Sequence, residues 1–476
     1  MHSRSMTSFH GVVARGKWKV GSLAAVSTKS SLWRHPYSTS TSTSKPDQGS
    51  KDQQRHKHFI YENRSQPNAR QAEKQSSPAT ASSLAQPRPL DGITVIALEQ
   101  VIAGPYCTRQ LAEMGARVVK IERPGQGDFA RSYDTRATGL SSHFAWTNRS
   151  KQSLALDIKK EEDLALLKKL ITKVDVFLQN LAPGAADRLG LGYEELKKTN
   201  ERLIVCDISG YGADGPYRNK KAYDLLIQAE AGMLSITGTE ETPSKVGASI
   251  ADIAAGMYAY SNIMAALLVR AKTGKGCRID VSMLECMVEW MGYPLYYAYD
   301  GASPPPRAGA SHASIYPYGP FQARDATVML GLQNEREWAS FCSKVLQKPE
   351  LTSDPRFAGS NQRSENRNEL KQIIEDVFAS MTAEEVVQRL DEAAIGNAKV
   401  NDMAAVWDHP QLAERKRWTE IRTEKGKMRV SIPPAIPSNV EPIIGPVPRV
   451  GAHNEKIMRE LEDGSFGKKH YQNPRI

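Results

Sequence analysis

Short apolar runs alternate with segments of helical periodicity from Leu90 onward. Residues 93–98, 117–122, 174–180 and 203–209 are rich in β-branched and other apolar side chains. Runs of this length and composition predict buried strands. Strands that alternate with helices usually pair in parallel, so the pattern predicts an α/β fold built on a mostly parallel sheet.

The first of these units covers residues 93–122. It consists of a strand, a turn at Ala103-Gly104-Pro105, a helix through Leu111 and a second strand, which is the order of a nucleotide-binding half. The turn lacks the sequence GxGxxG, whose glycines let the backbone approach a pyrophosphate. The unit therefore supports an NAD-linked dehydrogenase only weakly.

A long helix is predicted after Asp252. Its apolar residues recur at helical spacing on one face, and they are Ile253, Met257, Tyr260, Met264 and Leu267. Gly274 and Gly276 end this helix. A strand at 278–281 and a helix at 283–297, bent at Pro294, are expected to follow.

A second region follows a linker at residues 301–307 that is rich in proline and glycine. It contains a predicted strand at 327–332 and predicted helices at 335–346, 366–379 and 383–394. The segment 431–448 is rich in proline and is expected to be extended, and a helix at 454–462 closes the chain. We therefore expect a large domain over residues 90–300 and a linker with a smaller α/β domain over residues 301–424.

The formal net charge of +10 belongs to the first ninety residues. They hold 14 Lys and Arg against 4 Asp and Glu, while the rest of the chain holds 49 of each. A nucleic-acid-binding face requires a basic patch on the folded body. The charge distribution therefore argues against a nucleic-acid partner.

The leader has the composition of a cleavable mitochondrial presequence. It contains no acidic residue before Asp47, and its basic residues lie among serines, threonines and spaced apolar positions. We expect cleavage between Arg34 and Ser44 and a location in the matrix. Residues 38–86 are polar and too poor in apolar side chains to form a core, so residues 1–89 are expected to be presequence and disordered linker.

Membrane and metal sites have no support in the sequence. The longest apolar stretch, 253–269, contains Ser261 and Asn262 and falls short of the roughly 18–20 residues that a membrane helix needs. We therefore expect a soluble protein without a membrane partner. The five cysteines are widely spaced without CxxC, and HExxH does not occur, so we expect neither a disulfide framework nor a metal site.

Several linked motifs point to one family. They are LDGITVIALEQVIAGPYCTRQLAEMGARVVKIERPGQGD, SLALDIK, DVFLQNLAPGAADRLGLGYEEL, ISGYGADGPY and VGASIADIAAGMYAYSNIMAALLVRAKTGKG. In sequence and order they resemble the family III CoA-transferases (CaiB/BaiF type), a group that includes formyl-CoA transferase and succinyl-CoA:glutarate CoA-transferase. The resemblance covers nearly everything after Leu90.

The resemblance implies a fold and an assembly. The large domain of the family is Rossmann-like and is completed by the C-terminal tail, here residues 425–476. Each subunit is a ring-like chain threaded through its partner, which implies an interlocked homodimer with active sites between chains. The catalytic aspartate of the family lies in the motif that reads GASIAD here, and this position is Asp252.

The implied chemistry is covalent. The Asp252 carboxylate attacks the donor acyl-CoA thioester to give a mixed anhydride and a CoA thiolate. The thiolate returns to form an aspartyl-CoA thioester and releases the donor acid, and the acceptor acid reverses these steps. An aspartate with the ordinary pKa of about 3.9 is ionised at neutral pH and needs no separate base. Asp252 also opens the long helix, whose dipole favours its charge, and a plain N-cap is the alternative role.

CoA binding is implied for a set of basic and polar side chains that suit its pyrophosphate and 3′-phosphate. Motif matching places the set at Arg123, Lys159, Asn180, Arg188 and Lys221. Ile102 occupies a position near the nucleophile that is Gln in formyl-CoA transferases, so one polar contact is absent there. CoA is expected as a substrate, with no permanently bound cofactor.

The acid substrates are constrained by the loop 309–319, which reads GASHASIYPYG. Oxalate-specific members carry a run of glycines as a mobile loop, and its absence argues against formyl and oxalyl substrates. The loop is similar to that of members that use dicarboxylates, and His312 is a candidate contact for a distal carboxylate. We expect succinyl-CoA as donor and glutarate, hydroxymethylglutarate or itaconate as acceptor. Because water destroys both intermediates, the loops 301–306 and 309–319 are candidates to cover the site.

Two alternatives stay open. An α-methylacyl-CoA racemase resembles this chain but places His before Asp in a GHD motif, whereas this chain has Ala222-Tyr223-Asp224. A tyrosine with a pKa of about 10 is a poor proton exchanger at neutral pH, so Tyr223 is a candidate for orienting groups near the nucleophile instead. The second alternative is a non-catalytic CoA-binding protein, against which Asp252 and the basic set argue.

Overall fold

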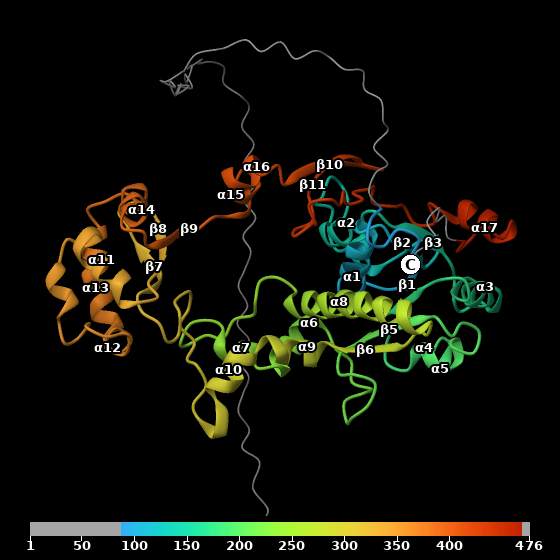
Figure 1. Cartoon of the computed structure of the whole chain (residues 1–476), viewed down its shortest axis with the longest axis horizontal. Coiled ribbons are helices and arrows are strands. Elements are labelled where there is room, and N and C mark those ends of the chain that lie inside the picture. Colours follow the sequence, from blue (N-terminus) through green and yellow to red (C-terminus); the bar gives the residue numbers. More distant parts are fainter. Residues whose placement is uncertain (1–86, 469–476) are drawn as a thin grey trace, which may run out of the picture. The chain divides into compact units, whose positions relative to one another are not determined.

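The computed structural model describes residues 87–468, which belong to one compact unit. The predicted presequence, its cleavage site and the linker up to residue 86 lie outside the described residues. The prediction of an α/β fold with a mostly parallel sheet is confirmed. One six-stranded sheet and two smaller antiparallel sheets make up the strands of the described part (Figure 1).

The large sheet is parallel throughout, in the order β3-β2-β1-β4-β5-β6. Its strands are β1 Thr94–Leu98, β2 Arg117–Glu122, β3 Gln152–Ala155, β4 Val176–Gln179, β5 Ile204–Ser209 and β6 Arg278–Ser282. All five strands predicted for this part of the chain are present, at 93–98, 117–122, 174–180, 203–209 and 278–281, as β1, β2, β4, β5 and β6. Strand β3 was not predicted, because four residues with a polar first position give no strand pattern.

Helices bury both faces of this sheet. Val95 and Ala97 of β1 belong to one hydrophobic cluster, and Ile96 and Leu98 belong to another, as the alternation of side chains along a strand requires. The first face is covered by α1 Ala103–Glu113, α6 Asp224–Glu230, α8 Ile250–Thr273 and α9 Met283–Trp290. The second is covered by α3 Glu161–Ile171, α4 Ala185–Arg188, α5 Tyr193–Leu196 and α17 Asn454–Glu462.

Helix α8 is the longest helix of the described part and packs closely on α1. Gly256 makes this possible, since a Cβ there would lie 2.8 Å from the Ala103 carbonyl oxygen. Gly274 ends the helix with a left-handed φ of 75°. By length and composition alone α8 is apolar enough to cross a bilayer, which the sequence analysis did not expect. Its buried residues, mostly alanines, pack in the domain core.

The predicted bend of the helix at 283–297 is wrong in its position. The structure has two helices, α9 and α10 Gly292–Tyr297, which meet at Met291 rather than at Pro294. Pro294 lies in the first turn of α10, where a missing N–H costs no helical hydrogen bond. Its ring would clash with the carbonyl oxygen of Trp290, four residues earlier, in a continuous helix, so the break falls one turn before the proline.

A second core belongs to residues 316–395. Its sheet is antiparallel and consists of β7 Tyr318–Gln322, β8 Thr327–Gly331 and β9 Gly396–Lys399. The helices are α11 Glu335–Ser340, a π-helical turn at Phe341–Val345, α12 Ser360–Glu365, α13 Arg367–Phe378 and α14 Ala383–Glu392. The predicted strand and three helices of this region are confirmed, with α11 continuing into the π turn.

The chain returns to the large sheet after this region. The hairpin of β10 Trp418–Thr423 and β11 Gly426–Ser431 packs Ile421 and Val430 against Phe144. Farther on, the Ser150 side chain donates to the Ile443 carbonyl oxygen and accepts from the Gly445 N–H. Helix α17 then buries Ile457 and Leu461 in the second-face cluster. The C-terminal segment is thus part of the large domain's core.

Short elements connect these parts. They are the 3-10 turns Phe129–Ser132, Tyr299–Gly301 and Pro349–Thr352, and the helices α2 Ser142–Asn148, α7 Met233–Ile236, α15 Met403–Trp407 and α16 Pro410–Glu414.

Candidate active site

Asp252 is the third residue of α8 and not its N-cap, so the alternative role as a plain cap is wrong. Ser249 occupies the N-cap position, without a capping hydrogen bond from its side chain. The cap comes from another helix instead. Asp224, the first residue of α6, accepts hydrogen bonds at Oδ1 from the backbone N–H groups of Ala251 at 2.8 Å and Asp252 at 3.3 Å.

The expectation that Asp252 has an ordinary pKa is also wrong. Burial and, second, the negative charge of Asp224 raise the pKa of the Asp252 carboxyl to about 7. The helix dipole acts in the opposite direction but does not compensate for these two effects. At neutral pH the side chain is therefore divided between acid and carboxylate.

Two tyrosines belong to the surroundings of Asp252. Tyr223 is the N-cap residue of α6, next to Asp224 in the sequence, and its side chain is 71% exposed. The pKa of Tyr133 is raised by burial and by interaction with Asp128, Asp252 and Tyr223. Tyr133 was not among the sequence candidates, because it lies more than a hundred positions from Asp252 and only the fold brings the two together.

A cavity of about 530 Å³ opens where the strands β1, β2, β3 and β4 end. Arg123 follows β2, Lys159 follows β3, and Arg188 lies on α4, and all three line this cavity together with Gln100 and Phe129. In sheets of this strand order, ligands bind at the carboxyl ends of the strands, where the order reverses between β1 and β4. The structure thus brings together three members of the predicted CoA-binding set.

The other members of that set have different positions. Asn180 joins the ends of β4 and β1, since its side chain accepts from the Gln100 N–H at 2.8 Å and donates to the Gln100 carbonyl oxygen at 2.9 Å. Lys221 is exposed and does not line the cavity. Ile102 is buried and occupies the N-cap position of α1, without a capping hydrogen bond to its side chain.

A buried ionic network supports the loop between β1 and α1. Lys120 contacts Asp128 at 2.8 Å and Glu99 at 3.5 Å, and Lys151 contacts Glu99 at 2.7 Å. Asp128 in turn accepts from the N–H of Val101, whose φ of 65° is unusual for a β-branched residue. Burial lowers the pKa of Lys151 to about 8, although Glu99 opposes this shift. The network was not predicted from the sequence, since its four members come from separate segments.

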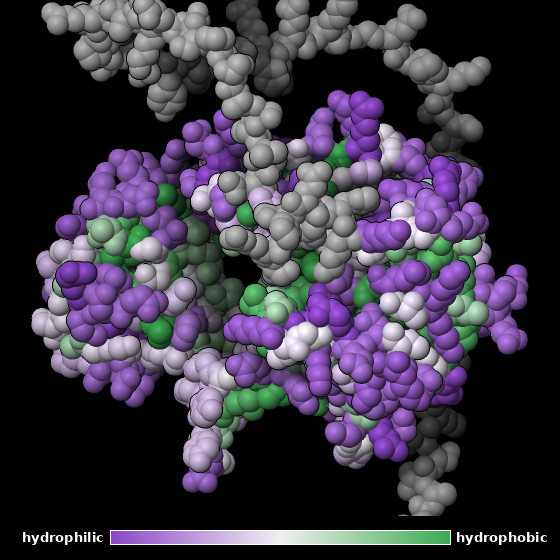
Figure 2. Space-filling view, turned by 45° about the vertical axis from the view of Figure 1, so that its right-hand side comes forward, coloured by the Kyte–Doolittle hydropathy of each residue, from purple (hydrophilic) through white to green (hydrophobic). Residues whose placement is uncertain are grey.

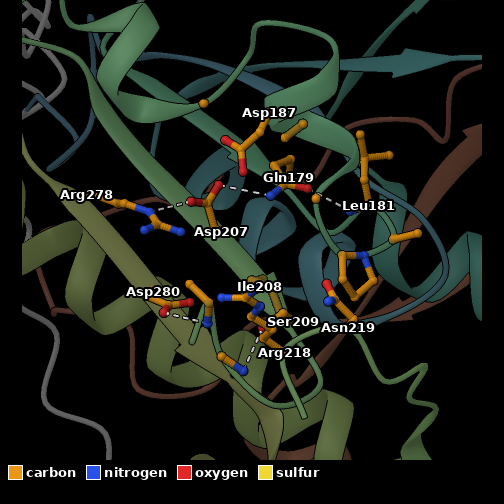
Figure 3. A pocket seen from close by; sticks show the side chains of 17 residues that line it. Gln179, Leu181, Asp187, Asp207, Ile208, Ser209, Arg218, Asn219, Arg278 and Asp280 are labelled. Atoms are coloured by element: carbon orange, nitrogen blue, oxygen red, sulfur yellow. Dashed lines mark hydrogen bonds and ion pairs between the residues drawn. The ribbon is translucent and has the colours of Figure 1, made fainter. Parts of the chain in front are cut away.

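A second cavity, of about 350 Å³, lies beside the first and shares Leu181 and Ala182 with it. Figure 3 shows that its wall is polar. The Asp207 carboxylate accepts from Gln179 at 2.9 Å and from Arg278 at 2.8 Å, and Asp280 accepts from the Ala213 N–H. These bonds connect β4, β5, β6 and the segment after β5, and Arg218 also lines the cavity.

His312 lies in the loop before β7. Its Nδ1 accepts from the backbone N–H groups of Ser314 at 3.2 Å and Ile315 at 3.0 Å, and its ring stacks on Tyr318. An Nδ1 that accepts leaves the ring proton on Nε2, which is then a hydrogen-bond donor. Among residues 87–468, no hydrogen bond or ion pair joins His312 to Asp252. In the same part of the chain, no group of three or more His, Cys, Asp or Glu side chains forms a metal site.

Comparisons with known proteins agree with this geometry. The model of CoA-transferase family III matches residues 90–454. The chain is 32% identical to human succinyl-CoA:glutarate CoA-transferase over 79% of its own length and 86% of the relative's. It is 36% identical to acetyl-CoA:oxalate CoA-transferase of Acetobacter aceti, over 71% and 87% of the two chains. A crystal structure of a CaiB/BaiF family protein from Brucella suis has a TM-score of 0.71 and 31% identity, covering 79% of this chain and all of the other. The chain belongs to CoA-transferase family III and is a CoA-transferase.

Proposed function

We propose that this CoA-transferase moves CoA from succinyl-CoA to a dicarboxylic acid such as glutarate, hydroxymethylglutarate or itaconate, with Asp252 as covalent nucleophile. The observation that carries the proposal is the position of the Asp252 carboxyl: it lies at the N-terminus of α8, largely removed from water, with its charge destabilised by Asp224. A carboxylate with a raised pKa is the stronger nucleophile, and at neutral pH a sizeable fraction is ionised.

Each step balances. The Asp252 Oδ adds to the thioester carbonyl carbon, and the C–S bond breaks to release CoA thiolate and leave an aspartyl–acyl anhydride. The thiolate sulfur attacks the aspartyl carbonyl carbon, and the donor acid leaves as a carboxylate. The acceptor carboxylate then attacks the aspartyl-CoA thioester, and the returning thiolate takes the new acyl group. Asp252 is regenerated as a carboxylate, so no net proton transfer is required.

The cavity at the carboxyl ends of β1 to β4 is the proposed CoA site. Arg123, Lys159 and Arg188 supply three cationic donors for the pyrophosphate and the 3′-phosphate. Leu98, Ile121 and Leu189 line the same cavity and offer an apolar wall for the adenine ring. Lys221, exposed on its loop, is proposed to reach CoA from outside the cavity.

The dicarboxylate preference rests on His312 and on the relatives. The Nε2–H of His312 is a donor of fixed orientation, because Nδ1 is held by two backbone N–H groups. A donor of this kind suits the distal carboxylate of a C5 acid. Several relatives carry succinyl-CoA in their names, including the human protein. We infer that Tyr223 and Tyr133 orient groups near the nucleophile, and that the loops 301–306 and 309–319 exclude water.

We further propose an interlocked homodimer. Large apolar and aromatic side chains are exposed on α9, on α10 and just after it, among them Tyr296 at 79% and Tyr299 at 73%. Trp290, Tyr293, Leu295 and Tyr297 are also exposed there. Figure 2 shows hydrophobic areas between the hydrophilic ones on one face of the molecule. Contiguous exposed apolar side chains of this kind usually mark an interface between chains.

A location in the mitochondrial matrix completes the proposal. It is supported by the basic leader without acidic residues before Asp47. N-terminal sequencing of the protein from purified organelles should find a start between Arg34 and Ser44, and an intact Met1 on the mature form would contradict the location.

The nucleophile is tested with Asp252→Asn. The amide keeps the size of the side chain but has no charge with which to attack a thioester, so the variant should lose at least about a thousandfold in rate, or on the order of 4 kcal/mol. Wild-type enzyme mixed with succinyl-CoA and quenched with hydroxylamine or borohydride should carry the modification on Asp252, within the peptide 246–270. Full activity of Asp252→Asn, or a label on Asp224, would refute the role.

The acid pair is tested with a panel of acceptors at fixed succinyl-CoA. The panel includes glutarate, hydroxymethylglutarate, itaconate and oxalate, and acetyl-CoA serves as a second donor. We expect the highest kcat/KM with a C5 dicarboxylate, and His312→Ala should lower it for dicarboxylates more than for monocarboxylates. A preference for oxalate would instead favour the activity named for the Acetobacter relative.

A further inference from the structure

One helix holds both ends of the segment that carries Asp252. Asp224 and Gln228 lie one turn apart on α6, and the Gln228 side chain is fully buried. Gln228 donates from Nε2 to Asp224 Oδ2 at 2.7 Å and accepts at Oε1 from the Val246 N–H at 3.0 Å. Asp224 Oδ1 accepts from the N–H groups of Ala251 and Asp252. The segment 246–252 is therefore fastened at its start by Gln228 and at its end by Asp224.

We propose that Asp224 is a positioning residue for the transfer reaction, which fixes the start of α8 and uses its negative charge to favour the covalent, uncharged forms of Asp252. This inference rests on the proposed nucleophilic role of Asp252. Gln228 holds Asp224 in place and prevents its rotation away from α8.

Hydrogen bonding keeps Asp224 in the form that this role requires. Its two oxygens accept from three N–H donors, two from the backbone and one from Gln228, and a carboxylate is an acceptor only. The Asp224 carboxylate is thus held by donors on both of its oxygens, with its charge directed at the start of α8.

The charge then acts differently on each state of the nucleophile. Free Asp252 is an anion beside another anion, which is unfavourable in a site shielded from water. The anhydride and the CoA thioester are neutral at this position, so their formation relieves the repulsion. Asp224 therefore raises the free energy of the resting carboxylate more than that of either intermediate, and it lowers the barrier to acylation.

Few other ionisable groups face Asp252. From the segment after β2, Tyr133 interacts with it, and Tyr133 also interacts with Asp128 and Tyr223. Helix α1 packs along α8. Its Tyr106 lies beside Gly256, which is one turn after Asp252, and its Cys107 and Glu113 interact with Tyr260, which is two turns after Asp252. The ionisable groups on β5, β6 and α9 do not shift the pKa of the Asp252 carboxyl; they are Cys206, Asp207, Arg278, Asp280, Glu285, Cys286 and Glu289. Asp224 is the sole charged partner in its described surroundings.

Two variants separate charge from position. Asp224→Asn keeps an oxygen for the Ala251 and Asp252 N–H groups but removes the charge, and Gln228→Met keeps the charge but removes both hydrogen bonds of the glutamine. In Asp224→Asn the acid limb of the kcat/KM profile should move to lower pH by about one unit, and kcat should fall at least about tenfold. In Gln228→Met, kcat should fall about tenfold while the acid limb stays in place.

Glu241→Gln is the matched control, because it removes one exposed carboxylate from the loop before the GASIAD motif and touches neither helix. Mass spectrometry of enzyme incubated with succinyl-CoA gives a second measurement. The fraction of subunits labelled on Asp252 at equilibrium should fall in Asp224→Asn and stay unchanged in Glu241→Gln. If Asp224→Asn does not fold, Asp224→Glu keeps the charge on a longer arm, and it should lose rate without moving the acid limb.

An Asp224→Asn enzyme with an unmoved acid limb and wild-type labelling would overturn the role of Asp224. This outcome is distinct from a failure of the proposed nucleophile, in which wild-type enzyme carries no label on Asp252 and Asp252→Asn remains active.

Discussion

The ionised Asp252 side chain lowers the stability of the folded protein, because its charge is unfavourable in the folded surroundings. Its pKa in the unfolded chain is near the ordinary 3.8, and folding raises it to about 7. Between these two values the folded protein binds more protons than the unfolded one, so this group's contribution to stability falls as the pH rises through the window. Below the window the group is protonated in both states and contributes nothing.

Asp252→Asn should therefore be more stable than the wild type at pH 8, by on the order of 1–2 kcal/mol, and equally stable at pH 4 or below. Thermal unfolding of the two proteins as a function of pH measures the difference. Asp214→Asn, at an exposed loop position, should show no such trend. Equal stability of Asp252→Asn and wild type at pH 8 would mean that the carboxyl is not destabilised by burial and by Asp224.

Arg188 offers a second prediction at the scale of single residues. If its guanidinium holds a phosphate of CoA equally well in ground state and transition state, Arg188→Gln should raise the KM for acyl-CoA roughly tenfold and leave kcat almost unchanged. Steady-state kinetics with succinyl-CoA tests this. Arg336→Gln, on the exposed surface of α11, is the control. A fall in kcat at constant KM would place Arg188 in the reaction rather than in CoA binding.

At the scale of helices, the close contact of α1 and α8 depends on one glycine. Any Cβ at Gly256 would meet the Ala103 carbonyl oxygen and the Tyr106 ring. Gly256→Val should lower the free energy of unfolding by roughly 1–3 kcal/mol, since the helices must separate to accommodate the branched side chain. Ser261→Val introduces the same residue on an exposed face of α8 and should change stability little. Similar denaturant midpoints for the two variants would contradict the tight packing.

Helices and strands were predictable from the sequence where one pattern of apolar residues extends over the whole element. The strands at 94–98 and 204–209 are rich in β-branched and other apolar residues, and α8 has apolar residues at helical spacing with a glycine at its end. Strands β3, β7, β9, β10 and β11 were missed, because they are short or half polar and lack a continuous apolar pattern. The break at Met291 was misplaced, since proline in a first turn and proline within a helix give the same sequence signal.

The candidate site was predictable only in part. Motifs indicated Asp252 and the three cationic residues that line one cavity, as each lies in a conspicuous local sequence. The raised pKa of Asp252 was not predictable, because it depends on burial and on Asp224, which lies 28 positions away. Tyr133 and the network of Glu99, Lys120, Asp128 and Lys151 were missed for the same reason.

For the whole molecule, the proposed threading of two chains has a measurable consequence. Threaded subunits must unfold to separate, so the protein should keep the mass of a dimer in light scattering on dilution to nanomolar concentration. Tagged and untagged dimers mixed in native buffer should not exchange subunits over days, but should exchange after denaturation and refolding. A folded, active monomer would contradict the assembly. The division into residues 90–300 with 425–476 and residues 301–424 also stays a prediction.

The position of α17 has a consequence for synthesis on the ribosome. Ile457 and Leu461 fill a cluster whose first members, Ile96 and Leu98, leave the exit tunnel long before them. The nascent large domain must therefore wait, with one face of its sheet incompletely covered, until α17 has been translated. A premature stop codon shortly before residue 454 would keep most of the preceding chain but leave this face open. Late truncations should consequently be retained by chaperones and degraded as readily as early ones.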